Sequence, residues 1–301
     1  MQNRIKLWIF IAITAIFAGF SIYNNLSLNR HALIYQDYMD QYSRVLNFEE
    51  RLLNTGEWLT TETEWRKTES KARDMMYYAD QHYQTACRLG YYFFFAALAF
   101  FPLIIILLHK TPFFYTALTT GVIIGALLCL HVGVTTPMLE ISALKSNLTV
   151  PVEFEVPIIN YPVSWEKTFS GEMYFYYQNK SILDVIKILW QSGNKLVSIA
   201  ILFFSIGVPT IKMLLSLLIL FKRNIQKSKV LTYIAGNIGK WSMADVFVAA
   251  TFLAFLSFNN MNTGIETRSN TLPGLYFFLS YCIVSIFSSH LVKFAISKGK
   301  A

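Results

Sequence analysis

Six stretches of apolar residues constrain this chain more than any other feature. They fall at about 7–26, 91–108, 113–134, 196–221, 243–258 and 273–294, the fifth being the shortest. A helix needs about 20 mostly apolar residues to cross a bilayer. Only 15% of the residues are charged, whereas soluble domains carry about 25%. We therefore predict a mainly α membrane protein with six transmembrane helices.

The first stretch resembles a signal peptide, because Arg4 and Lys6 precede it. No small-x-small cleavage site follows it, so we expect an uncleaved anchor. The second and third stretches are separated only by residues 109–112, which predicts a tight turn between them.

The charges of the loops predict the orientation. Residues 222–243 hold five basic residues and no acidic one, and further lysines lie at the C-terminus. Residues 27–90 hold 8 basic and 10 acidic residues, and residues 135–195 hold 5 and 6. Because cytoplasmic loops are enriched in Lys and Arg, both termini are expected in the cytoplasm. The net charge of +8 is then a feature of topology and needs no nucleic acid.

Residues 27–90 show helical periodicity. Small and apolar residues recur at steps of three and four, as in a heptad seam: Ala72, Met76, Ala79, Tyr83, Ala86, Gly90 and Phe93, and in the first half Ile34, Tyr38, Tyr42, Val45 and Leu52. Asn54, Thr55 and Gly56 are expected to end one helix, and Thr60 or Thr61 to cap the next. We predict an extended extracytoplasmic helical hairpin. It is either a structural stalk or docking surface, or a ligand-sensing device.

Residues 135–195 show a different pattern. Leu148 to Val156 alternates, with Pro151 and Pro157 interrupting it, and 171–177 is aromatic-rich, so we expect strands. Ser181 followed by Asp184 is typical of a helix start, and 192–194 of its end. Together these predict a small, compact β-containing cap over the bundle.

Lys212 is the clearest polar candidate, since it lies deep inside the fourth stretch. A charged side chain within a membrane is costly and is a functional candidate by default. Two interpretations remain open: a lysine snorkelling to the surface, or a bundle-facing ammonium that meets a carbonyl, a carboxylate or a lipid head group. Pro209 frees the carbonyl of Ser205 and predicts a kink there.

Asp245 opens the fifth stretch. It either complements the helix dipole or pairs with Lys212, although the two lie at different expected depths. Hydroxyls also line the spans, and we expect most of them to bond between helices. Those weighed as functional are Ser205, Thr210 and Thr251.

Motifs for catalysis or metal binding are not found in the sequence. It shows no Ser-His-Asp order, no phosphate-binding glycine loop and no C-x-x-C pair among its three cysteines. We therefore expect no enzyme activity, no cofactor and no metal site.

The last two thirds of the chain resembles the paraquat-inducible protein A family. The resemblance rests on VPTIKMLLSLLIL (208–220), on GKWSMADVF (239–247) and on PGLYFFLSYCIVSIFSSHLV (273–292). By motif it singles out Pro209, Lys212 and Asp245, together with Trp241, Ser242 and Met243. It implies a four-span module over 113–295, after a two-span unit with the hairpin (1–112) and before a basic cytoplasmic tail (296–301).

The resemblance also implies a role and a place. Such a protein would reside in a bacterial inner membrane and pass phospholipid to or from a mammalian-cell-entry (MCE) type tunnel protein. Typical members carry two modules and zinc ribbons, whereas this sequence shows one module and no ribbon, and a homo-oligomer would restore the second module. Two alternatives remain: an accessory or sensor protein docking an extracytoplasmic partner through the hairpin, and a small-ion transporter.

Overall fold

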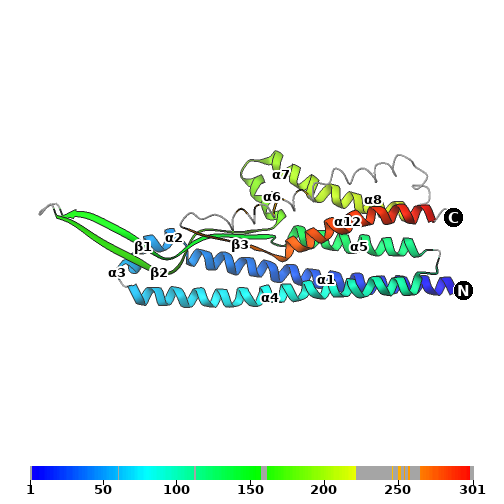
Figure 1. Ribbon diagram of the computed structural model, residues 1–301, viewed down its shortest axis with the longest axis horizontal. Helices are drawn as coiled ribbons and strands as arrows, with labels where there is room; N and C mark the ends of the chain where they lie inside the picture. Colours follow the sequence, from blue (N-terminus) through cyan, green and yellow to red (C-terminus); the bar gives the residue numbers. More distant parts are fainter. Residues whose placement is uncertain are drawn as a thin grey trace.

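Two very long helices form the frame of the computed structural model, which describes residues 2–59, 61–111, 113–156, 161–221 and 265–298 and the single positions 246, 250, 251, 254 and 257. Helix α1 spans Gln2–Val45 and helix α4 spans Thr61–Leu108, with 44 and 48 residues. At 1.5 Å per residue they are about 66 and 72 Å long, whereas a hydrocarbon core is about 30 Å thick. The predicted continuation of the first two spans as an extended helical hairpin is confirmed (Figure 1).

Small residues let these two helices pack closely. Ala72, Ala79 and Ala86 follow one another at seven-residue steps on α4 and are at most 5% exposed. Facing them, the buried apolar residues are Leu28, Ala32 and Met39 on α1 and Leu46 directly after its end. The expected seam on α4 is thus confirmed except at Met76, which is exposed, and that on α1 was predicted in the wrong register. The ring of Tyr38 lies beside the seam and stacks on Tyr78 of α4, and that of Tyr42 makes an edge-to-face contact with Tyr174.

The connection between α1 and α4 contains two short helices, α2 (Phe48–Leu53) and α3 (Thr55–Leu59). The first long helix ends at Val45, earlier than predicted, because the Asn47 side chain caps α2 by accepting from the amides of Glu49 and Glu50. Helix α4 begins at Thr61, in agreement with the predicted region of its start, and the cap expected from Thr60 or Thr61 lies outside what the structure describes.

Five helical segments of the described chain are long and apolar enough to cross a membrane. Besides α1 and α4 they are α5 (Phe114–Thr135), the continuous run α7 (Lys195–Ile201), η1 (Leu202–Gly207) and α8 (Val208–Phe221), and α12 (Pro273–Lys298). The predicted span 243–258 lies almost wholly outside the described residues. Helix α1 begins, α12 ends and α4 turns into α5 at the same end of the bundle (Figure 1).

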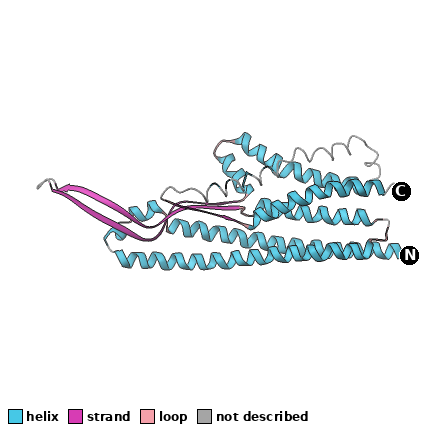
Figure 2. Cartoon of the chain, viewed as in Figure 1, coloured by secondary structure: helices cyan, strands magenta, loops and turns pink. Residues whose placement is uncertain are grey.

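Three antiparallel strands pair in the order β2–β1–β3: β1 (Leu139–Val156), β2 (Tyr161–Lys180) and β3 (Glu266–Thr271). Strand β3 pairs only with residues 139–144 of β1. Beyond that point β1 and β2 continue as a two-stranded ribbon that projects past the helical hairpin (Figures 1 and 2). The third strand was not predicted, since its sequence is short and polar.

The strands expected at 148–156 and 171–177 are confirmed as parts of β1 and β2, but they extend as a ribbon and do not form the compact cap that was expected. Strand β1 runs through Pro151, which pairs in register with Glu166, and does not break there. Proline has no amide hydrogen, so it is tolerated only where one side of a strand needs no partner. Pro151 meets this condition because β3 has already ended. The expected helix cap is confirmed: Ser181 and Asp184 form a capping box at the start of α6 (Ile182–Gln191).

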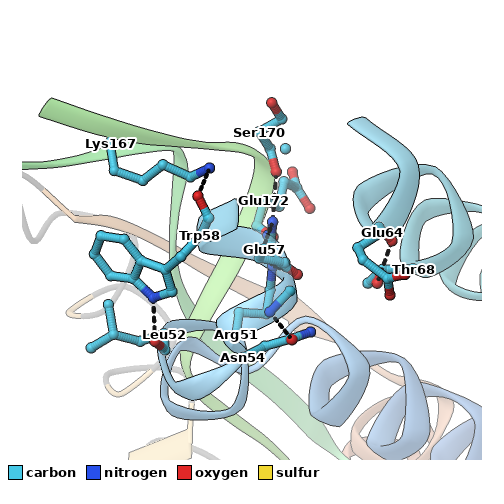
Figure 3. Close-up of polar contacts among 12 residues, drawn as sticks. Arg51, Leu52, Asn54, Glu57, Trp58, Glu64, Thr68, Lys167, Ser170 and Glu172 are labelled. Carbon is cyan, nitrogen blue, oxygen red and sulfur yellow. Dashed lines mark hydrogen bonds and ion pairs between the residues drawn. The ribbon is translucent and has the colours of Figure 1, made fainter. Parts of the chain in front are cut away.

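A buried guanidinium joins the helical hairpin to the ribbon. The register of β1 and β2 is interrupted between Ser146 and Leu148, so no β1 residue is paired with Ser170 or Gly171. Arg51 donates to the carbonyl oxygens of Ser170 and Glu172 at 3.0 and 3.1 Å. It also forms an ion pair with Glu57 at 3.0 Å (Figure 3). The guanidinium thus supplies donors where the strand ladder has a gap.

The Arg51→Met variant tests this junction. It removes the charge but keeps an unbranched apolar side chain, and leaves the Glu57 carboxylate buried without its partner. We expect the free energy of unfolding to fall by about 3–5 kcal/mol, measured by thermal unfolding in detergent. The control, Arg73→Met, breaks the exposed pair with Glu69 and should cost about 0–1 kcal/mol. Equal, small losses in both variants would contradict the role of Arg51.

Helices α5 and α12 approach each other at a glycine. A Cβ atom at Gly133 would lie 2.7 Å from the backbone nitrogen of Phe278, which is closer than real Cβ contacts. Gly125, on the same helix, has no other atom within 4 Å of that position.

The pair Gly133→Ala and Gly125→Ala separates packing from helix propensity. We expect Gly133→Ala to lower the free energy of unfolding by about 1–3 kcal/mol, because the helices must move apart. Gly125→Ala should be neutral or stabilising by up to ~1 kcal/mol. Thermal unfolding in detergent measures both, and the same melting temperature for the two variants would show that α5 and α12 do not meet here.

Candidate functional site

The ammonium of Lys212 lies inside the helical bundle. It is 6% exposed, and its Nζ donates to Oγ of Ser285 at 2.8 Å and to the Ser285 carbonyl oxygen at 3.2 Å. Helix α8 supplies the lysine and α12 the serine. Of the two interpretations left open by the sequence, the structure shows the bundle-facing lysine. In the described part of the chain no carboxylate lies within ion-pair distance of it.

The irregularity predicted at Pro209 takes the form of a π-helical turn, η1, directly before it. The amide of Val208 donates to the carbonyl of Phe203, five residues earlier. Such a turn absorbs the missing amide of a proline without ending the helix. Ser205 and Pro209 are buried, and Thr210 is half-buried. This turn precedes Lys212 by less than two helical turns.

Most hydroxyls in the described spans donate to a carbonyl of their own helix, whereas bonds between helices were expected. Thr119 donates to Tyr115 at 2.6 Å, Thr120 to Thr116 and Thr210 to Ile206, each to a carbonyl four residues back on its own helix. The physical reason is that this carbonyl is always within reach of a serine or threonine in a helix. Ser285 differs, since its hydroxyl accepts from Lys212 across the interface.

The remaining sequence candidates are placed only in part. Thr251 is helical and half-buried. Trp241, Ser242, Met243 and Asp245 lie outside the described residues, so the pairing of Lys212 with Asp245 stays a prediction. Among the described residues, no three His, Cys, Asp or Glu side chains gather closely enough to hold a metal ion.

A buried carboxylate at the base of the sheet was missed by the sequence analysis. Glu140, on β1, is 6% exposed and accepts a short hydrogen bond from the hydroxyl of Tyr35. Tyr177 and Asn270 also hydrogen-bond to it. Burial raises the pKa of Glu140, and these three hydrogen bonds partly offset the rise. The signal in the sequence was an acidic residue directly after an apolar span.

Glu140 predicts a pH dependence of stability. Because its pKa is raised in the folded protein, the folded state holds the proton more tightly than the unfolded state. Stability should therefore fall as the pH rises from about 4.5, the ordinary value, through the raised pKa, by about 1.4 kcal/mol per pH unit. Glu140→Gln should remove this part of the dependence, and Glu166→Gln, at an exposed ribbon position, should keep the wild-type profile. Thermal unfolding at several pH values measures this, and parallel profiles for all three proteins would refute it.

Comparison with known proteins places one part of the chain. Residues 165–294 match the family model of Paraquat-inducible protein A. The match begins within β2 and ends within α12, so it includes α6, α8 and Lys212 and excludes α1, α4 and α5. The resemblance noted in the sequence covered 113–295, so the matched region begins 52 residues later and ends one residue earlier. No curated protein and no solved structure matches the chain.

Proposed function

Because residues 165–294 belong to the paraquat-inducible protein A family, we propose that this chain is an inner-membrane component of an intermembrane lipid transport system. It would load phospholipid into, or unload it from, an MCE-type tunnel protein. Both termini lie in the cytoplasm in this proposal, and the ribbon and the helical hairpin face the partner. The role is one of binding and transfer and requires no catalytic residue or cofactor.

The observation that supports lipid handling is the buried ammonium of Lys212. Burying a charge is costly unless it is paired and hydrogen-bonded. Ser285 provides two acceptors, whereas an ammonium has three donors. The phosphate of a lipid head group has the charge and the oxygen atoms to complete the site. The adjacent π-helical turn is a feature that often occurs at functional sites.

A second candidate function is docking of an extracytoplasmic partner without lipid transfer. The projecting β1–β2 ribbon favours it, because a two-stranded ribbon carries unpaired strand edges that a partner can cover. In the lipid-transport proposal the same surface docks the tunnel protein. The two functions differ in that only lipid transport requires the ammonium of Lys212.

The substitution Lys212→Met separates them, with Lys212→Arg as the charge-conserving control and Lys195→Met as an exposed-lysine control. Lys212→Met keeps an unbranched chain and removes the charge, so we expect a folded protein with a permeable outer membrane in cells. Lys212→Arg should retain most activity and Lys195→Met all of it. Outer-membrane integrity and thermal unfolding are measured together.

The partner is tested by purifying each protein in mild detergent and identifying the lipids and proteins that accompany it. We expect an MCE-type protein and phospholipid with the wild type, and less phospholipid with Lys212→Met. An intact outer membrane and unchanged lipid in Lys212→Met would overturn the lipid-handling role. Absence of any MCE-type protein from the wild-type preparation would overturn the partnership.

A further inference from the structure

A groove of about 950 Å³ lies between α4, β3 and the first half of α12. Clefts of about 300–1,000 Å³ are the usual size for small-molecule binding. Its walls come from α4 and α12, both candidate membrane spans, and from residues 269–272 at the end of the sheet. It is separate from the Lys212 site. Residues 280 and 283, which line it, lie on the face of α12 opposite to Ser285, since each helical residue turns by about 100°.

The two ends of the groove differ in chemistry. On the bundle side it is lined by Phe94, Phe277 and Ile283, which belong to the apolar spans. On the sheet side it is lined by Asp80, Ser269 and Asn270. The groove therefore runs from hydrocarbon-facing surface to polar surface, as does a phospholipid with its acyl chains and head group.

The charge of the groove lining favours one kind of head group. Asp80 is the only ionisable acid or base among the described lining residues apart from the tyrosines and Cys87. Asp80 is exposed, and its carboxylate accepts from Gln84 at 2.7 Å. Behind the wall, Glu140 is hydrogen-bonded to Tyr35 and Asn270, which both line the groove. An anionic lipid would thus meet no cation here, whereas a protonated amine would meet a carboxylate.

A second hollow of about 560 Å³ adjoins the first and shares Met76 and Asp80 with it. It follows α4 outward to Trp65, and its charged lining residues besides Asp80 are Glu172 of β2 and the ion pair of Arg73 with Glu69. From Phe94 to Trp65 the helix rises about 44 Å. The head-group end of the groove is therefore continuous with a path along the hairpin away from the bundle.

We propose that the groove between α4, β3 and α12 binds one phospholipid whose head group carries a protonated primary amine. The carboxylate of Asp80 receives the ammonium, and the acyl chains lie across Phe94 and Ile283. This inference rests on the proposed lipid-transport function and names the lipid class. The groove uses α4, which lies outside the region matched to the family.

The test is native mass spectrometry of the purified full chain after exchange into mixed phosphatidylethanolamine and phosphatidylglycerol. We expect wild type to retain the amine lipid over the anionic lipid by about three- to fivefold, the effect of an exposed ion pair. Asp80→Asn should bring the ratio close to one. Asp74→Asn, an exposed α4 position that does not line the groove, should keep the wild-type ratio.

A second variant tests occupancy of the apolar end. Ser280→Phe narrows the groove and should reduce retention of both lipids, with the melting temperature reporting that the fold is kept. Equal retention of the two lipids by wild type, or an unchanged ratio in Asp80→Asn, would overturn the proposal. Those results would leave the Lys212 phenotype and the MCE partnership intact. Amine-lipid retention without any MCE-type partner would instead overturn the proposed function and leave the groove standing.

Discussion

The contact of Arg51 with the interrupted part of β2 is the interaction on which the extramembrane architecture depends. The ribbon and the helix pair each satisfy most of their own backbone, so a few contacts hold them together, among them the bond from the Tyr174 amide to the Leu46 carbonyl at 2.8 Å. The guanidinium takes as acceptors the carbonyl of Ser170, in the unpaired stretch of β2, and that of Glu172 next to it, and Glu57 neutralises its charge. Trp65 covers the guanidinium at 4.4 Å and contacts Gly171, where φ is +78° and only glycine fits easily. Four segments meet at this one buried ion pair.

Close approach of small residues governs helix packing in the same way, both in the helical hairpin and within the apolar spans. Alanines at seven-residue steps bring α4 against α1, and Gly133 brings α5 against α12. Close backbones also let side chains hydrogen-bond across the interface: Asn24 of α1 donates to the Leu89 carbonyl of α4 at 2.6 Å. Since lipid gives no hydrophobic drive to helix association, such packing and hydrogen bonds hold the helices together.

Helix α12 separates two polar sites whose charged groups have opposite signs. One face presents Ser285 to the Lys212 ammonium within the bundle. The other forms the wall of a groove whose polar end carries the Asp80 carboxylate. A phosphate suits the first and an amine the second, so a zwitterionic phospholipid carries groups complementary to both. The groove needs α4, and thus the proposed lipid site includes the N-terminal unit, which also extends away from the bundle.

Elements whose signal is local could be predicted from the sequence. Apolar length predicted the helices, heptad spacing predicted the α4 seam, and Ser181 with Asp184 predicted a helix start. Proline chemistry predicted the irregularity before Pro209. In each case the cause lies within a few turns of one helix.

Tertiary structure alone decided what depends on residues far apart in the chain. The partner of Lys212 lies 73 positions away, and the acceptors of Arg51 lie about 120 positions away. The short polar strand β3 acquires its conformation only by pairing with β1, and the register of the α1 seam is selected by the alanines of α4. The groove exists because α4, β3 and α12 converge. No local pattern encodes these features, because the energy of each arises from a surface that two or more segments form together.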